Sequence, residues 1–196
     1  MNLHALEGRA VFAGTRRAAA RRRLGLGPAC FVVLCSVLAG TPCAGIDTVI
    51  LGVARLRQRH GVDGLLLVAL GIAADAELAR LRELTRALGM RAHVRFVIAA
   101  PMNALRDCHA AADVLVNTPW GSASISSAPL SSAPRRTAHA AASSPRPVIG
   151  SDAGQLRAAT LDGATGYLIP PRDPETLAAR LAHLANLAVP AETAFQ

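Results

Sequence analysis

Short, uninterrupted apolar runs alternate with amphipathic segments along most of this sequence, and this alternation limits the fold more than any other feature. The runs lie at residues 31–34, 65–68, 94–97, 114–116, 147–150 and 166–169. Runs of this kind, in which every residue except Arg95 is apolar or small, are typical of strands buried on both faces of a parallel sheet. The sequence therefore predicts an α/β fold with an open, doubly wound parallel sheet, similar to a Rossmann fold.

Helices are predicted between these runs because apolar residues recur there at intervals of three and four. The predicted helices cover residues 46–60, 76–88, 102–112, a short stretch near 154–160, and the segment that begins at Asp173. Gly61 and Gly89 end the first two helices as C-caps, and the Asp173 carboxylate caps a helix with Pro174 in its first turn. Gly163 and Gly166 are expected in turns with positive φ.

The composition changes abruptly after Trp120. Residues 121–146 contain eight Ser, seven Ala and three Pro with no acidic residue, which is typical of an irregular or disordered loop. A chain of 196 residues is long enough for one ordinary domain. We therefore predict a basic N-terminal segment over 1–28 that is poorly ordered in part, a single domain over 29–187 that contains the irregular loop, and a tail over 188–196.

The net charge of +8 lies in two segments. Residues 1–28 hold six Arg and one Glu, residues 121–146 hold three Arg, and the remainder has twelve Arg and twelve acidic residues. We interpret the excess charge as belonging to solvated segments. Aromatic residues make up only 3% of the chain, too few for a base-stacking surface. The sequence therefore predicts no specific nucleic-acid partner.

No metal site is predicted from the cysteines and histidines. The four cysteines show no CxxC spacing and the six histidines are scattered singly; the cysteines are Cys30, Cys35, Cys43 and Cys108. Structural zinc sites and redox pairs need closely spaced ligands. We expect inert thiols and no metal cofactor.

The segment over 21–44 allows two interpretations. Three arginines, an apolar run over 29–40 and then small residues imitate a secretory signal, which would make the protein exported. The run is shorter than the ~20 apolar residues that span a bilayer, so we predict no transmembrane segment and leave peripheral membrane contact open. The alternative is a buried strand near Phe31, and we favour it because strands and helices continue to alternate after it. A cytoplasmic protein is then expected.

Three later segments carry a resemblance to a known family. They are AAADVLVNTPW (110–120), PVIGSDAG (147–154) and DGATGYLIPPRDPETLAARL (162–181). In order and distance they resemble the C-terminal half of group 1 glycosyltransferases, which are retaining enzymes with two Rossmann-like domains. Residues 45–68 resemble the helix and strand that follow the first loop of that half. The resemblance implies a domain that binds a nucleotide sugar without a cofactor, and it implies that the acceptor-binding domain is missing.

Two features of the family are absent from this sequence. The family's first loop carries an Arg and a Lys that neutralise the donor diphosphate, whereas residues 36–45 read SVLAGTPCAG. The family's Glu-Pro-Phe-Gly turn and the second Glu after it are also missing, since no acidic residue stands between Asp113 and Asp152. Without these groups we expect little or no activity. We hypothesise that two compensated reading-frame shifts replaced residues 36–44 and 121–146.

The resemblance implies donor-binding residues at the ends of two strands. They are Asn117, Thr118, Pro119 and Trp120 after one strand, and Gly150, Ser151, Asp152 and Gly154 at the next. Each has a structural alternative, which is packing for Trp120, loop hydrogen bonding for Asn117 and Thr118, and a tight turn and cap for the second group. No catalytic residue is assigned. Asp113 is expected to cap or end the preceding helix.

The function expected from the sequence is that of a truncated glycosyltransferase-like protein, the donor half, weakly active or inactive alone. Its expected partners are a nucleotide sugar and either a separately encoded N-terminal half or a second copy of itself. One alternative is a nucleotide-binding or interaction module of α/β fold without enzymatic activity. Another is an exported basic protein from which the signal has been removed.

Overall fold

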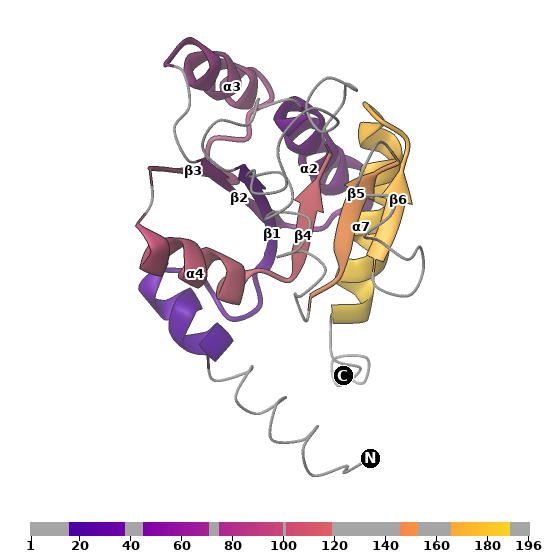
Figure 1. Ribbon diagram of the computed structural model, residues 1–196. Helices are drawn as coiled ribbons and strands as arrows, with labels where there is room; N and C mark the ends of the chain where they lie inside the picture. The colour runs from indigo at the N-terminus through magenta and orange to yellow at the C-terminus, as the bar shows by residue number, and fades with distance from the viewer. Residues whose placement is uncertain are drawn as a thin grey trace, which may run out of the picture.

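The computed structural model describes residues 16–37, 45–70, 75–99, 101–118, 146–152 and 166–188. Its elements are β1 (Phe31–Val37), α2 (Ile46–His60), β2 (Gly64–Leu70), α3 (Asp75–Ala87), β3 (Val94–Ile98), α4 (Met102–Ala111), β4 (Val114–Asn117), β5 (Val148–Ser151), β6 (Gly166–Ile169) and α7 (Pro174–Ala188). A further helix covers residues 16–23. The strands form one sheet in the order β3-β2-β1-β4-β5-β6, and every neighbouring pair is parallel (Figure 1). The predicted α/β fold with an open parallel sheet is confirmed.

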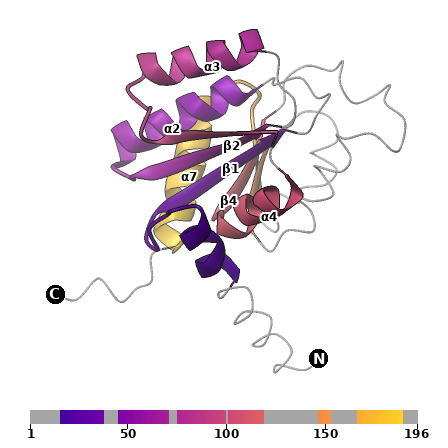
Figure 2. The same ribbon diagram turned by 90° about the vertical axis from the view of Figure 1, so that its left-hand side faces the viewer.

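Helices cover both faces of this sheet, which is why the interior strands β1 and β2 are apolar on both sides. Figure 2 shows α2, α3 and α7 on one face, with α4 and the helix over 16–23 on the other. Successive residues of β1 alternate between two cores: Val33 packs in the core beneath α2 and α7, and Val32 and Leu34 pack in the core beneath α4. All seven residues of β2 are buried. Burial on both faces explains the uninterrupted apolar runs in the sequence.

The predicted element types hold wherever the structure describes them. Gly61 and Gly89 follow α2 and α3 with φ of 66° and 67°, the left-handed conformation of a C-cap. The strand predicted over 31–34 extends to Val37, and it lies in the interior of the sheet. The helix predicted near 154–160, the loop over 121–145, Gly163 and the tail from 189 lie outside the described residues.

Gly166 differs from its prediction. It lies in β6 and is not among the residues with positive φ. A Cβ atom at this position would lie 1.9 Å from the Val148 carbonyl oxygen of β5. Close approach of the neighbouring backbone therefore requires the glycine, and no turn is involved.

The helix over 16–23 contradicts the expectation that the basic charge of residues 1–28 is solvated. Arg21 is 3% exposed, and its guanidinium donates to the carbonyl oxygens of Ala111 at 3.1 Å and Pro28 at 2.6 Å. It also donates to the Asp113 carboxylate at 2.6 Å, and Arg17 pairs with the other oxygen of that carboxylate. Residues of the N-terminal segment thus belong to the packed fold.

Asp113 has a different role from the predicted one. Helix α4 ends at Ala111, where the amide of Ala112 donates to the Cys108 carbonyl oxygen. The Asp113 carboxylate accepts a hydrogen bond from the Val32 amide at 2.8 Å, and the Asp113 amide donates to the Val32 carbonyl oxygen at 2.8 Å. The residue is structural, as expected, but it connects β4 to β1 instead of capping a helix.

In the part of the chain that the structure describes, no helix is both long enough and apolar enough to cross a bilayer.

Helix α7 supplies the first testable prediction. The Asp173 carboxylate accepts hydrogen bonds from the Thr176 hydroxyl at 2.6 Å and the Thr176 amide at 3.0 Å, which satisfies a free amide of the first turn. Replacing Asp173 with Ala is expected to lower the free energy of unfolding by about 1 kcal/mol at neutral pH. Asn accepts similar bonds, so Asp173→Asn should retain most of the stability. Urea unfolding of the three proteins measures both effects.

The pH dependence of this cap follows from its pKa. The hydroxyl and then the amide of Thr176 hold the pKa of Asp173 below its ordinary value. A carboxylate with a lower pKa in the folded chain stabilises the fold above the unfolded pKa, and this contribution is lost as pH falls through the folded pKa. The difference in the free energy of unfolding between wild type and Asp173→Ala should therefore shrink below pH about 4. A difference that stays constant on acidification would contradict this assignment.

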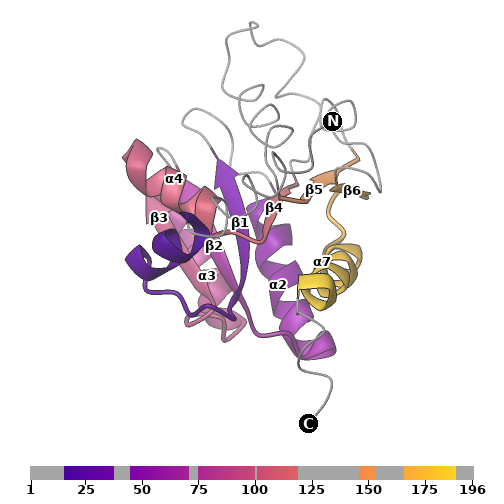
Figure 3. The same cartoon turned by 90° about the horizontal axis from the view of Figure 1, so that it is seen from below.

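The contact between α2 and α7 supplies the second prediction. The two helices lie side by side (Figures 1 and 3), and a Cβ atom on Gly52 would lie 2.6 Å from Leu177 Cδ2 and 2.9 Å from its Cγ. Ala favours helices over Gly by about 1 kcal/mol, yet overpacking a core costs about 1–3 kcal/mol, so Gly52→Ala should be destabilising.

A double-mutant cycle tests that explanation. Leu177→Ala removes Cγ and Cδ2, the two atoms closest to the new Cβ, and leaves only Leu177 Cβ at 3.3 Å. Gly52→Ala should therefore be neutral or stabilising in the Leu177→Ala background. Equal losses in both backgrounds, measured by chemical denaturation, would show that the close approach is not the cause.

Candidate functional site

The sheet reverses its direction of winding between β1 and β4. From β1 the chain proceeds through β2 to β3 on one side, and from β4 it proceeds through β5 to β6 on the other. In open α/β sheets, ligands bind at such a reversal, in the crevice outside the carboxyl ends of the strands. The candidate site is therefore the edge where β1 ends at Val37 and β4 ends at Asn117.

The N-terminus of α2 is fixed to this edge by one side chain. Thr118 is buried, and its hydroxyl donates to the Gly45 carbonyl oxygen at 3.0 Å. Gly45 precedes α2 with φ of 96°, and a Cβ atom there would lie 1.8 Å from the Thr118 carbonyl oxygen. Only glycine fits so close to β4 in this conformation. The first turn of α2 therefore opens beside the carboxyl end of β4.

The predicted residues of β4 and β5 lie next to each other. Asn117 and Gly150 occupy the same register position on the two neighbouring strands. Ser151 is fully buried, whereas Asp152 is exposed and its amide donates to the Ile169 carbonyl oxygen of β6 at 2.7 Å. Half-buried Asn117 and exposed Asp152 are thus the two side chains best placed to meet a ligand.

The structure accordingly brings together five of the eight predicted donor-binding residues at one sheet edge; they are Asn117, Thr118, Gly150, Ser151 and Asp152. Their roles differ, because the Thr118 hydroxyl is already used within the fold. Pro119, Trp120 and Gly154 lie outside the described residues. Their assignment as donor-binding residues stays a prediction.

The described part of this edge carries acidic side chains and no basic ones. Among residues 36–37, 45–48, 116–118 and 150–152, the ionisable side chains are those of Asp47 and Asp152. Asp47 accepts a hydrogen bond from the Thr48 amide at 2.8 Å, and its other oxygen lies 3.8 Å from an Arg80 nitrogen. An anion bound here would therefore depend on backbone amides, on Asn117 and on cations from elsewhere.

One cation at the same end of the sheet was missed by the sequence analysis. Arg172 is exposed and has φ of 58°, in the turn between the end of β6 and the Asp173 cap. The signal was present in the sequence, since an Arg between a strand and a helix cap must follow the carboxyl end of that strand. Two strands separate β6 from β1, so Arg172 borders the far side of the candidate site.

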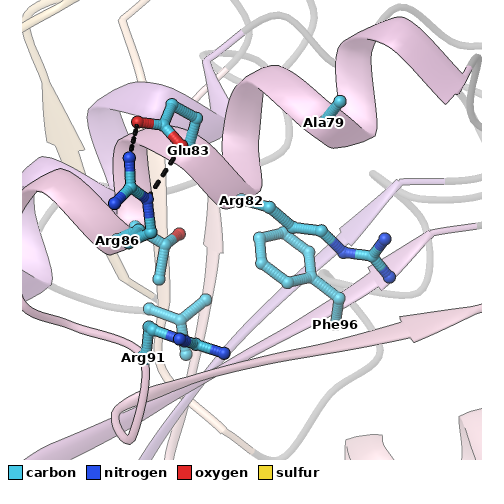
Figure 4. Close-up of a pocket in the computed structure, with 8 residues that line it drawn as sticks. Ala79, Arg82, Glu83, Arg86, Arg91 and Phe96 are labelled. Carbon is cyan, nitrogen blue, oxygen red and sulfur yellow. Dashed lines mark hydrogen bonds and ion pairs between the residues drawn. The ribbon is translucent and has the colours of Figure 1, made fainter.

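A cavity of about 380 Å³ lies elsewhere, between α3 and β3. Figure 4 shows its lining, with Arg82, Arg91 and Phe96 beside an ion pair of Glu83 with Arg86. The Arg86 guanidinium donates to Glu83 at 2.6 and 3.0 Å. Its place beside β3, an edge strand, separates this cavity from the β1–β4 reversal.

Among the residues that the structure describes, no three His, Cys, Asp or Glu side chains are grouped closely enough to hold a metal ion.

Comparison with known proteins identifies a family with a similar sequence. The sequence model of the family "Glycosyl transferases group 1" matches residues 31–186. A search of curated protein sequences gives no match.

Solved structures of this family share the fold. Sucrose-phosphate synthase from Thermosynechococcus elongatus is 26% identical with a TM-score of 0.65, covering 86% of this chain and 39% of its own. The C-terminal domain of the group 1 glycosyl transferase LpcC from Francisella tularensis is 18% identical with a TM-score of 0.64, covering 87% of this chain and 82% of its own. Anabaena Alr3699/HepE, solved with UDP and glucose, is 22% identical with a TM-score of 0.60, and the match covers 91% of this chain and 43% of HepE.

The lengths covered by these matches agree with the prediction that this chain corresponds to the C-terminal half of a group 1 glycosyltransferase. The chain spans 39% of the sucrose-phosphate synthase and 43% of HepE, but 82% of the isolated LpcC domain. It therefore corresponds to one Rossmann-like domain of a larger relative. With four fifths of its length matched by the family model, this chain belongs to the group 1 glycosyl transferases.

Proposed function

We propose that this chain binds a nucleotide sugar as the donor half of a retaining glycosyltransferase, without a metal, and that it is weakly active or inactive alone. The observation that carries the proposal is the reversal of the sheet at β1 and β4, with the predicted donor-binding residues of β4 and β5 side by side at its carboxyl edge. HepE has a similar fold and was solved with UDP and glucose. The donor nucleotide would lie across the ends of β1, β4 and β5.

The low activity follows from charge. Transfer from a nucleotide sugar develops negative charge on the leaving diphosphate, and fixed cations normally stabilise it. Among residues 36–37, 45–48, 116–118 and 150–152, the ionisable side chains are Asp47 and Asp152, and Arg172 borders only the far side of the site. The sequence also lacks the Arg and Lys of the family's first loop. Each missing preorganised group costs about 3–4 kcal/mol of barrier, so two such losses slow transfer by several orders of magnitude.

The acceptor would be bound by another half of the enzyme, outside these residues. Relatives of the fold are more than twice as long as the part that this chain matches. In this proposal, that half is a separately encoded polypeptide. The alternative is that a second copy of this chain takes its place. The complete enzyme would work in the cytoplasm, since the apolar run at 31–37 is built into the sheet as β1.

Calorimetric titration of the 196-residue chain with UDP-glucose and GDP-mannose tests donor binding. We expect saturable binding of one of them with a Kd on the order of 1 mM, because backbone amides and Asn117 remain but the diphosphate cations do not. Replacing Asn117 with Leu should weaken that binding roughly fivefold, the effect of one lost hydrogen bond. The matched control is Asn186→Leu, at an exposed position near the end of α7.

Two outcomes would overturn parts of this proposal separately. If neither nucleotide sugar saturates the chain, or if both Leu variants weaken binding equally, the donor site is assigned wrongly and the fold serves another ligand or partner. If the chain alone releases UDP from the donor at a rate typical of complete glycosyltransferases, donor binding stands and the expected inactivity is wrong.

A further inference from the structure

A second cavity, of about 390 Å³, lies against the helix over 16–23. Its lining consists of Arg17, Ala18, Arg21, Arg22, Leu26 and Pro28. Three of these six residues are arginines and none is acidic. The cavity is at the end of the sheet where Asp113 meets the start of β1, so it lies opposite the carboxyl edge that holds the candidate donor site.

The arginines beside this cavity outnumber the available carboxylate. Arg17 and Arg21 pair with opposite oxygens of the Asp113 carboxylate. Arg146 lies in the same group: burial and then repulsion by Arg17 lower its pKa, whereas the charge of Asp113 raises it. Within the described residues, the guanidinium groups of Arg17 and Arg21 thus share one carboxylate, which leaves an excess of one positive charge in a partly buried place. Uncompensated charge of this kind is costly unless a counter-ion is bound.

Two details show that this excess is available to a ligand. Among the residues that the structure describes, the buried Nε atom of Arg17 has no hydrogen-bond partner, although burying a polar group without one is unfavourable. Arg22 is exposed at the cavity, and within the described ranges its side chain forms no ion pair. Arg21, by contrast, is fully engaged in holding the fold.

We propose that this cavity is a binding site for a phosphate group, held by the guanidinium groups of Arg17 and Arg22 and the positive field of Arg21 and Arg146. Guanidinium groups bind phosphate oxygens through paired N–H donors, and arginine is the residue best suited to this geometry. The apolar wall formed by Leu26 and Pro28 would lie against whatever the phosphate is attached to. The ligand is therefore a phosphomonoester, soluble or in a lipid headgroup.

The cavity between α3 and β3 is the natural competitor, because it also holds three arginines (Figure 4). Its lining includes the Glu83 carboxylate, which already takes two hydrogen bonds from Arg86. An anion there would meet a repelling carboxylate in the lining itself, beside the guanidinium groups of Arg82 and Arg91. The cavity at residues 17–28 has no such carboxylate in its lining, so phosphate should prefer it.

Titration of the full chain with inorganic phosphate, followed by amide chemical shifts in NMR spectra, tests the site. We expect saturable shifts among residues 17–28 and 111–113, weakened by added sodium chloride. Arg22→Gln should weaken phosphate binding roughly fivefold, and Arg22→Lys should retain more of it because the charge is kept. Since Arg22 is exposed and unpaired in the described fold, these variants should unfold at the wild-type temperature.

Arg91→Gln is the matched control, with the same change of charge in the competing cavity. The proposal predicts unchanged phosphate binding for this variant. Binding that is lost in Arg91→Gln and kept in Arg22→Gln, shifts confined to residues 79–96, or the absence of saturation would each overturn it. Because the site lies at the other end of the sheet, its failure would leave donor binding untouched, and the reverse also holds.

Vesicles separate the two sources of phosphate. Binding to phosphatidylcholine vesicles that contain phosphatidic acid, absent from pure phosphatidylcholine vesicles and reduced in Arg22→Gln, would assign the site to a lipid headgroup. Phosphate binding without vesicle binding would assign it to a soluble phosphomonoester. Either result supports the site.

Discussion

The carboxylate of Asp113 fixes the alignment of β1 with β4, on which the remaining architecture depends. Only two residue pairs, Val33 with Val114 and Leu34 with Leu115, form the ladder between these strands. Asp113 extends that short ladder through both its amide and its carboxylate, which bond to the backbone of Val32. The buried guanidinium of Arg21 neutralises the carboxylate. Removing one partner of a buried pair leaves an unpaired charge and costs about 3–5 kcal/mol.

This alignment also determines where a ligand can bind. At the reversal of winding between β1 and β4, the chain proceeds from the two strands to opposite sides of the sheet, and in open α/β sheets ligands bind in the crevice outside the carboxyl ends at such a point. At that edge the contact between Thr118 and Gly45 sets the first turn of α2 against β4, while Asn117 and Gly150 lie side by side. Interactions at the amino ends of the strands thus support a site at their carboxyl ends.

The element types could be predicted from the sequence because periodicity reports local structure and burial. Helix α2 and strand β6 were predicted with the bounds observed, and the positions of Asn117 and Asp152 at strand ends followed from the strands themselves. The ion pair between Arg21 and Asp113 could not be predicted, since 92 residues separate the partners and no local pattern indicates such a pair. For Thr118 the sequence left ligand contact and loop hydrogen bonding open, and the structure shows its hydroxyl in a hydrogen bond within the fold, to a partner 73 residues away.

The two ends of the sheet differ in the charge of their side chains. The described carboxyl edge is acidic at Asp47 and Asp152, whereas the amino end gathers arginines around Asp113. The fold predicts that a nucleotide sugar binds at the carboxyl edge, and the negative charge of that edge predicts that the binding is weak. The most direct measurement is of intermolecular nuclear Overhauser effects between the ribose and uracil protons of UDP and the chain. We expect contacts to the amides of Asn117, Thr118 and residues 150–152; contacts confined to residues 17–28 or to α3 would show that the donor does not bind at the carboxyl edge.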